Sequence, residues 1–178
     1  MVNDWDLVVH QKMLFKLPAK VTVNNILEQY LDHLKRQQDM EALKRGVAQE
    51  VIRGVGEYFN VSLGSQLLYN VEKLQYKEDY ESMGSVQPAD VYGSSHLLRL
   101  MVKIGGYISF SNFSEQSSKV KKNEDFINMH TIMCILFQMI EDQIDDFLSY
   151  LDMNRSMFFS SKNYSSATTE YLNRNGQK

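Results

Sequence analysis

The chain has 178 residues, the length of a single domain. Hydrophobic residues make up 43% of it and charged residues 23%, with only two prolines, so the composition excludes a disordered segment and provides for a real core. A formal net charge of −3 argues against a protein that binds polyanions through its overall charge.

The first two predicted elements are helices separated by a proline. Asn3 or Asp4 is expected to cap a short helix that runs toward Leu14, and Pro18 ends it because proline biases the residue before it away from helix. Thr22 is expected to cap the second helix. An apolar stripe at helical spacing follows this cap and consists of Ile26, Leu27, Tyr30, Leu31 and Leu34.

A third helix is predicted from Met40 to Phe59, because apolar residues recur there at three- and four-residue steps. Gly46, Gly54 and Gly56 weaken its intrinsic propensity by up to ~1 kcal/mol each, so tertiary packing must hold it. Gly54 and Gly56 are also the positions where another helix could approach closely.

Short elements and a loop are expected next. Residues 63–69 are predicted to form a helical turn, and residues 71–83 to be partly helical. Gly84 to Asp90, which contains a proline, is the clearest interior loop. Ser94 or Ser95 is then expected to cap a strong helix that is rich in Leu, Met, Val and Ile.

The last part of the chain is dominated by one long helix. Before it, Gly105-Gly106 is expected either to interrupt the preceding helix or to allow tight packing, and residues 107–110 are the one candidate strand. The long helix is predicted from Asn123 to Leu151 by apolar residues at helical spacing. Beyond Ser160 the chain is rich in Ser, Thr, Asn and Tyr, and we expect a docked or frayed tail.

No combination of residues supports a metal or cofactor site. The histidines are scattered along the chain as His10, His33, His96 and His130, without partners at ligand spacing. Acidic residues do recur at helical spacing near the end of the long helix, as Glu141, Asp142, Asp145 and Asp146. A solvated helix face explains them better than a cation site. We therefore expect no metal and no cofactor.

Catalysis finds no better support in the sequence. Cys134 lies within an apolar stripe, where a buried and unreactive thiol is expected. Ser94, Ser95 and His96 offer a nucleophile and a base in principle, but serines that cap the start of a helix explain this cluster better. No glycine-rich phosphate loop follows a strand. The sequence predicts that the protein is not an enzyme.

The sequence also lacks membrane and export signals. The longest apolar stretches are far shorter than the roughly 20 residues that a membrane span needs. Asn3, Asp4 and Asp6 interrupt any apolar run at the start, so no signal peptide is expected. We expect a soluble protein without membrane partners.

Several aromatic side chains flank the predicted helices, namely Trp5, Tyr69, Tyr92, His96 and Tyr107. Burial in the core is the commoner role for any single one of them. Together with ten methionines, they are also what a groove for an apolar peptide requires. The physical properties of these residues leave both interpretations open.

A series of short motifs extends the interpretation. In chain order they are Asp4-Trp5-Asp6-Leu7, Leu17-Pro18-Ala19-Lys20, Ile26-Leu27, Glu57-Tyr58-Phe59-Asn60, Gln66-Leu67-Leu68-Tyr69, Gln75-Tyr76, Val91-Tyr92-Gly93, His96-Leu97-Leu98-Arg99-Leu100, Phe147-Leu148-x-Tyr150-Leu151 and Phe158-Phe159. Each is short, but their number and order closely resemble the MRG domain, the C-terminal module of the mortality-factor-related chromatin proteins. The matches run from about residue 2 to residue 171.

The resemblance implies an all-α fold: a single compact multi-helix domain over residues 1–178, with a core over about 2–160, a docked or frayed tail over 161–178, and room for a minor β-hairpin. The chromodomain expected N-terminal to this module in the family is absent from the chain. The resemblance also implies a nuclear, non-catalytic adaptor that scaffolds histone acetyltransferase and deacetylase complexes on chromatin. Direct contact with nucleic acid or nucleosomes is the alternative, and the acidic balance of the chain disfavours it.

The resemblance further implies an apolar groove for short partner segments of the Phe-x-Leu-Pro type. Val2, Trp5, Tyr69 and His96 match groove positions of the family. Lys103 stands where family members carry Arg, and its ammonium lacks the planar fork of a guanidinium. It could pair with backbone carbonyls or with an acidic partner.

Two further features of the sequence lead to expectations. The segment from about Ser117 to Met139 looks longer than in family members, and residues 117–125 are expected to form a mobile entrance to the long helix. The chain also contains Phe15-Lys16-Leu17-Pro18, which matches the Phe-x-Leu-Pro pattern. Packing of Phe15 and Leu17 into their own core is the favoured explanation, and docking into a second copy is the alternative. Homo-oligomers are therefore possible but not expected.

Overall fold

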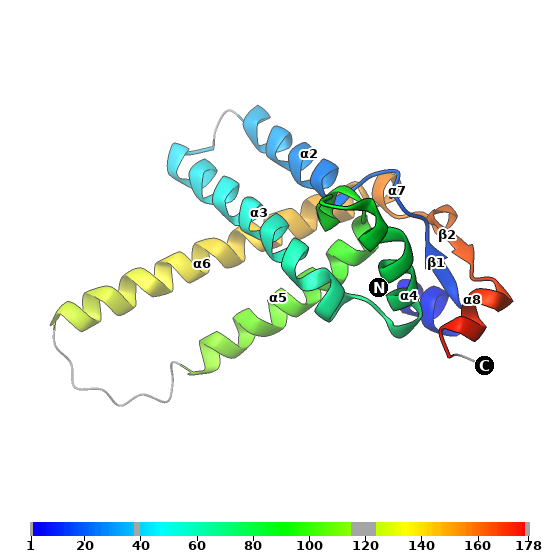
Figure 1. Ribbon diagram of the computed structural model, residues 1–178. Helices are drawn as coiled ribbons and strands as arrows, with labels where there is room; N and C mark the ends of the chain where they lie inside the picture. The colour runs from blue at the N-terminus through cyan, green and yellow to red at the C-terminus, as the bar shows by residue number, and fades with distance from the viewer. Residues whose placement is uncertain (1, 38–39, 115–123, 177–178) are drawn as a thin grey trace.

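The computed structural model describes the backbone of residues 2–37, 40–114 and 124–176, and the side chains of residues 4–37, 40–80, 82–106 and 135–176. More than half of the chain is helical, as predicted. Four long helices form its frame (Figure 1). They are α2 (Val23–Arg36), α3 (Ala42–Ser62), α5 (Ser94–Ser114) and α6 (Glu124–Met153).

Thr22 caps the start of α2, as the sequence predicts, and it does so in a capping box with Asn25. The Thr22 hydroxyl accepts from the Asn25 backbone N–H at 3.3 Å, and the Asn25 side-chain oxygen accepts from the Thr22 N–H at 3.2 Å. Two backbone donors that the first turn leaves without helical partners are thereby satisfied. The apolar stripe of α2 then lies inward, against α3.

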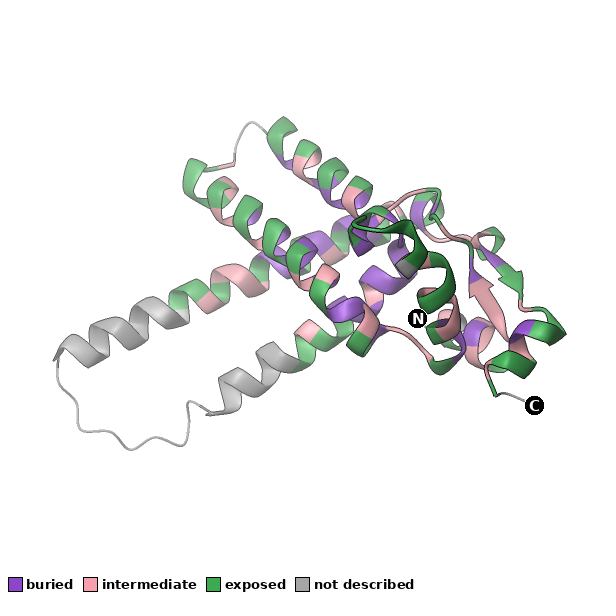
Figure 2. Cartoon of the chain, viewed as in Figure 1, coloured by how far each residue is buried: buried purple, intermediate pink, exposed green. Residues whose placement is uncertain are grey.

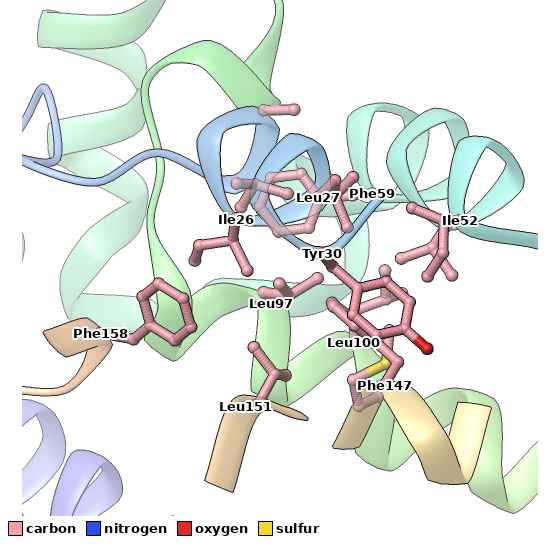
Figure 3. Packing of buried hydrophobic residues seen from close by; sticks show 14 of the residues in the cluster. Ile26, Leu27, Tyr30, Ile52, Phe59, Leu97, Leu100, Phe147, Leu151 and Phe158 are labelled. Atoms are coloured by element: carbon pink, nitrogen blue, oxygen red, sulfur yellow. The ribbon is translucent and has the colours of Figure 1, made fainter. Parts of the chain in front are cut away.

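The core lies where the four long helices meet (Figure 2). Figure 3 shows side chains from α2, α3, α5 and α6 meeting there, with Phe158 of α7 (Arg155–Phe158) beside them. The largest buried members are Tyr30, Tyr92, Phe59, Phe147 and Phe158. Each buried Leu or Phe contributes about 1.5–3 kcal/mol, so packing holds α3 despite its glycines. Of these, Gly56 permits a close approach: a Cβ there would lie 3.1 Å from Leu27 Cδ1.

Short helical turns connect α3 to α5. They are η2 (Leu63–Leu67), η3 (Asn70–Glu72), α4 (Lys73–Gln75), η4 (Tyr76–Tyr80), η5 (Glu81–Met83) and η6 (Pro88–Asp90). The predicted turn over residues 63–69 and the partly helical stretch over residues 71–83 are thereby confirmed. The predicted loop ends in η6, where Pro88 opens a 3-10 turn.

The prediction of a helix that is capped by Asn3 or Asp4 and reaches Leu14 is wrong at both ends, because Asn3 and Asp4 lie inside the first helix and the helix stops before Leu14. The chain forms α1 (Val2–Trp5) and a π-helical turn, η1 (Asp6–His10), and then turns at Lys12, whose φ is 54°. Residues Met13–Phe15 form strand β1. A positive φ is incompatible with a right-handed helix, so the helix cannot continue through Lys12.

The minor sheet joins the two ends of the chain. Strand β1 pairs antiparallel with β2 (Tyr164–Ser166), with Phe15 opposite Tyr164, so the strands form a sheet and not a hairpin. The tail is docked by this pairing and continues as α8 (Thr169–Arg174). The candidate strand over residues 107–110 is wrong, because α5 runs through Gly105-Gly106 to Ser114 without interruption.

A second apolar cluster lies beneath the sheet and consists of Val8, Phe15, Ala19, Val71, Tyr164 and Tyr171. Phe15 is 3% exposed in it. The favoured explanation for Phe15-Lys16-Leu17-Pro18 is therefore confirmed for Phe15, and docking of this segment into a second copy would require the cluster to open. The expected mobile entrance over residues 117–125 falls largely outside the described residues, and α6 begins at Glu124.

Candidate functional site

The candidate site is built around Arg99 of α5, which is 7% exposed. Its Nε and Nη2 atoms donate to the two carboxylate oxygens of Asp4 on α1 at 2.9 and 3.1 Å. Its Nη1 and Nη2 atoms donate to Glu72 on η3 at 2.6 and 3.1 Å, and Nη1 also donates to the Leu67 carbonyl at 2.9 Å. One planar guanidinium thus ties α1 and the connecting turns to α5.

Glu72 is the innermost carboxylate of this group, at 1% exposure. It accepts hydrogen bonds from the Tyr69 backbone N–H at 2.8 Å and from His96 Nε2 at 3.1 Å. Burial alone raises the pKa of Glu72, but the His96 ring and the Arg99 guanidinium outweigh burial and bring the pKa down to about 2. The carboxylate is therefore ionised at neutral pH, and Arg99 is its permanent counter-charge.

His96 is the fourth member of what we call the buried charge cluster (Asp4, Glu72, His96 and Arg99). Burial lowers the pKa of His96, and the neighbouring Arg99 lowers it further. The ring is therefore neutral at neutral pH, and its Nε2 carries the proton because ionised Glu72 can only accept. Its Nδ1 atom has no partner among the described atoms, and it lies among apolar and aromatic side chains that include Tyr92.

Aromatic side chains hold the cluster from two sides. The Tyr69 ring lies under the Arg99 guanidinium, 4.0 Å from its central carbon, a cation–π contact. On the other side, the Tyr164 hydroxyl donates to Asp4 at 2.6 Å and bonds to the Ser95 hydroxyl at 2.6 Å. The C-terminal strand β2 thereby fixes the position of α1.

The start of α5 is set by a close approach at Gly93. A Cβ at this position would lie 3.0 Å from Ala19 Cβ and 3.0 Å from the Val21 carbonyl oxygen, so glycine is required. The Gly93 carbonyl accepts the first helical bond, from Leu97 N–H at 3.2 Å. This anchor fixes the rotation of α5, and with it the direction of His96 and Arg99.

The serines of α5 do not cap it as predicted. The helix begins at Ser94, but the Ser94 hydroxyl donates to the Phe158 carbonyl at 2.7 Å, and Ser95 bonds to Tyr164. His96 bonds to Glu72 instead. Both hydroxyls therefore join α5 to the C-terminal part of the chain, and these contacts give His96 no serine to activate.

The outer surface above the cluster carries exposed side chains. Trp5 is 46% exposed, and its ring makes an edge contact with His10 at a centroid distance of 4.5 Å. On α5, Val102 and Lys103 are also exposed. Lys103 lies one helical turn beyond Arg99, on the same side of α5. An indole left at the surface beside a well-packed interior is a common mark of an interface.

A pocket of about 370 Å³ opens beside α1. Its apolar lining comes from Leu7, Leu98, Leu148, Leu151 and Phe159. Its polar rim includes Asp4 and Tyr164, which also belong to or contact the buried charge cluster. A volume in this range accommodates a large apolar side chain of a partner. We call this pocket, taken together with the exposed Trp5 and Lys103 and the half-buried Tyr69, the α1 surface; the three side chains flank the buried charge cluster and do not line the pocket itself.

The groove residues that the sequence predicts differ in how deeply the structure buries them. Trp5 and Lys103 are exposed, Tyr69 is half-buried, and His96 is 1% exposed. The side chain of Val2, the first residue of α1, lies outside the described side chains. Tyr69 and His96 meet through Glu72 and Arg99, and Trp5 follows Asp4 directly, but among the described side chains no hydrogen bond or ring contact joins Lys103 to Trp5.

Sequence reasoning missed the roles of Asp4, Glu72 and Arg99. Asp4 and Arg99 stand within motifs that carry the family resemblance, and Arg99 interrupts an otherwise apolar run from Leu97 to Val102. A charge inside an apolar helix must be paired when the helix is buried, and this was the available signal. The positions of its partners depend on the fold.

The described residues show neither a metal centre nor a membrane span. In the described part of the chain, no three His, Cys, Asp or Glu side chains come together in a way that could hold a metal ion. None of its helices is long and apolar enough to cross a bilayer.

Comparison with known proteins gives a consistent result over almost the whole chain. A family model described as MRG matches residues 1–166. The NuA4 complex subunit EAF3 homolog of Drosophila melanogaster is 38% identical over 177 residues, which is 99% of this chain and 37% of that protein.

Two mammalian proteins show similar identity. Mortality factor 4-like protein 2 of Homo sapiens is 37% identical over 171 residues, or 96% of this chain and 52% of that protein. Mortality factor 4-like protein 1 of Mus musculus is 37% identical over 171 residues, or 96% of this chain and 42% of that protein. The chain therefore spans about half or less of the length of the curated relatives it matches.

Proposed function

The chain belongs to the MRG family, and on that premise we propose that it is a non-catalytic adaptor that binds short apolar segments of partner proteins. One relative is named as a NuA4 complex subunit. We infer a corresponding setting for this chain, as a subunit of histone-modifying complexes in the nucleus. Segments of the Phe-x-Leu-Pro type, which the family resemblance implies, are the expected ligands.

The α1 surface is the feature that carries this proposal. An exposed indole and an apolar pocket of about 370 Å³ lie over a charge cluster whose carboxylates are already paired. Trp5 offers a large, rigid contact area at low entropic cost, and the pocket accepts an apolar side chain. The cluster beneath supplies rigidity, so little ordering is left to oppose binding.

The individual residues take different parts in the proposed binding. Trp5 and the exposed edge of Tyr69 contact the partner, while Lys103 pairs with its carbonyl or acidic groups. His96 is buried, so we assign it a positioning role: it holds Glu72, and Glu72 holds the Tyr69 backbone. Val2 completes the groove at the start of α1, as the family resemblance implies.

The test is a titration of a Phe-x-Leu-Pro peptide against the intact chain and its variants. Trp5→Ala is expected to weaken binding by ~2 kcal/mol or more, since a central aromatic anchor is lost. Tyr69→Ala is expected to weaken it similarly. Leu43→Ala is the matched control, because Leu43 is a large apolar side chain, 65% exposed, on α3. Thermal melts check that each variant folds. Unchanged affinity in both aromatic variants would remove the α1 surface from the proposal.

A further inference from the structure

A second hollow, of about 500 Å³, lies between two parts of the chain: the end of β1 with the connection to α2, and α7 with the segment that follows it. Three lysines line it, namely Lys16, Lys20 and Lys162, and no Asp or Glu stands among the described residues of its lining. The lysines come from two chain segments that are distant in sequence. A purely basic rim around a hollow is unexpected in a chain whose formal net charge is −3.

Within the described part of the chain, no carboxylate neutralises the lysines of this basic hollow. Lys20 and Lys162 are exposed, and neither forms an ion pair with a carboxylate in the described part of the chain. The Lys16 ammonium donates to the Lys162 carbonyl at 2.8 Å, which holds the two segments together and leaves further N–H groups of Lys16 available. Lys35, by contrast, pairs with Asp32 at 2.8 Å.

Apolar side chains form part of the lining of the hollow. Met157 is 51% exposed, Pro18 is exposed, and the buried ring of Phe15 closes the inner wall. Methionine adapts its shape to an apolar partner. The hollow therefore combines three cations with a small apolar wall.

We propose that the basic hollow binds an acidic peptide segment of a partner protein. Carboxylates of the segment pair with Lys16, Lys20 and Lys162, and one apolar side chain packs on Met157 and Pro18. A nucleic acid fits less well, because a duplex needs an extended row of cations, whereas the lining of the hollow offers three lysines. The concave shape and the apolar wall favour a peptide.

The proposal goes beyond the proposed function and does not depend on it. The basic hollow and the apolar pocket of the α1 surface share Ser160 in their linings. They are therefore neighbours, and a partner chain with an acidic stretch beside an apolar anchor can occupy both. The test below uses an acidic peptide that lacks Phe-x-Leu-Pro, so the two proposals succeed or fail separately.

The experiment measures fluorescence anisotropy of a labelled peptide, Asp-Glu-Leu-Asp-Glu-Asp, with the intact chain at low and at physiological ionic strength. The double variant Lys20→Glu/Lys162→Glu is expected to weaken binding on the order of tenfold or more, because charge-assisted contacts become repulsive. Lys16 is left unchanged, since its hydrogen bond holds the loop. Replacing the peptide's Leu by Ser is expected to weaken binding as well.

The matched control is Lys73→Glu/Lys77→Glu, which makes the same change in net charge at two exposed lysines outside the hollow. It should leave affinity for the peptide unchanged. Absence of peptide binding to the unmodified chain, or equal loss in both double variants, would overturn the proposal. Tighter binding of a short DNA duplex, abolished by the hollow variant alone, would assign the hollow to nucleic acid instead. Circular dichroism melts confirm that each variant is folded.

Discussion

At the scale of single residues, Arg99 shows why a buried charge can be kept. Removing a guanidinium and two carboxylates from water costs several kcal/mol per ion, and their attraction offsets this only when every group is hydrogen-bonded. Asp4 and Glu72 supply four oxygens to Arg99, and the Leu67 carbonyl takes a further N–H. Such a cluster specifies one position for α1, which a purely apolar contact would leave less defined.

The cluster predicts that the protein loses stability in acid. The pKa of folded His96 lies below its ordinary value of 6.5, because burial and then Arg99 oppose the charged ring. Below about pH 6.5 the unfolded chain binds a proton at His96 that the folded chain does not, so stability is full above that pH and falls as the pH is lowered. Protonation of Glu72 lowers the stability further at lower pH. The pKa of Glu72 is 4.5 in the unfolded chain and about 2 in the folded one, so the stability that its ionised form contributes is lost as the pH falls from 4.5 to about 2.

Urea unfolding as a function of pH checks this prediction. His96→Gln keeps a neutral side-chain N–H that can donate to Glu72, but it does not titrate. We expect the unfolding free energy of this variant to depend less on pH between 6.5 and 4.5 than that of the unmodified chain. Equal slopes for the two proteins in that window would show that His96 is not the group responsible.

The sequence could indicate part of this site. The physical properties of Trp5, Tyr69 and His96 left both a core and a groove position open for each of them, and the structure separates them: Trp5 is exposed, Tyr69 is half-buried and His96 is buried. The charge cluster could not be predicted, since Asp4, Glu72 and Arg99 meet only through tertiary packing across long sequence separations. Nothing in a local pattern states that these three charges are neighbours.

At the scale of elements, helices α2 and α3 approach each other closely where Gly56 of α3 faces Leu27 of α2. Gly56 of α3 is buried beside Leu27 of α2, whereas nothing lies within 4 Å of a Cβ placed on Gly54. The two glycines belong to the same helix, two residues apart, but only one of them is needed for the contact. The effect of an alanine on the unfolding free energy should therefore differ between the two positions.

Gly54→Ala is expected to stabilise the protein by up to about 1 kcal/mol, because alanine has the better helix propensity and restricts the unfolded chain. Gly56→Ala gains the same propensity, but its Cβ would lie 3.1 Å from Leu27 Cδ1, so Leu27 must shift. Gly56→Ala should therefore stabilise less than Gly54→Ala, or destabilise. Urea unfolding of both variants measures the difference. A larger gain for Gly56→Ala would contradict the close packing of α2 on α3.

The helices themselves could be predicted from the sequence more fully than the sheet. Local signals, such as the Thr22 cap and the apolar stripes, define α2, α3 and α6 to within a few residues. Strands β1 and β2 are only three residues long each and pair across the whole chain, so no local alternation identifies them. The glycines at 105 and 106 likewise pointed to an interruption that α5 does not show; the Leu, Arg, Met and Lys residues that precede them are strong helix formers.

At the scale of the whole molecule, the C-terminal segment closes the domain over its own start. Strand β2 pairs with β1, the Tyr164 hydroxyl holds Asp4, and the Tyr171 hydroxyl donates to the Val71 carbonyl. Tyr171 also accepts from the Gln75 N–H at 3.0 Å. Figure 1 shows both chain ends on the same side of the molecule, away from the extended ends of α5 and α6. The α1 surface therefore depends on residues at both ends of the sequence.

Truncation after Asn163 tests this dependence. It removes β2 and α8 and uncovers Phe15 and Val71 of the second apolar cluster, so we expect a loss of several kcal/mol in unfolding free energy, from lost burial and unpaired groups. Hydrogen exchange should rise most in α1 and β1, while the core between α2, α3, α5 and α6 keeps its protection, since its buried side chains are untouched. Affinity for a Phe-x-Leu-Pro peptide should fall as well, because α1 is less ordered in the truncated chain.

Arg174→Ala is the control for the truncation. The ion pair of Arg174 with Glu78 is half-exposed and contributes at most about 1 kcal/mol. If the truncated chain melted and bound peptide as the full chain does, the C-terminal segment would be dispensable and α1 would be positioned by Arg99 alone.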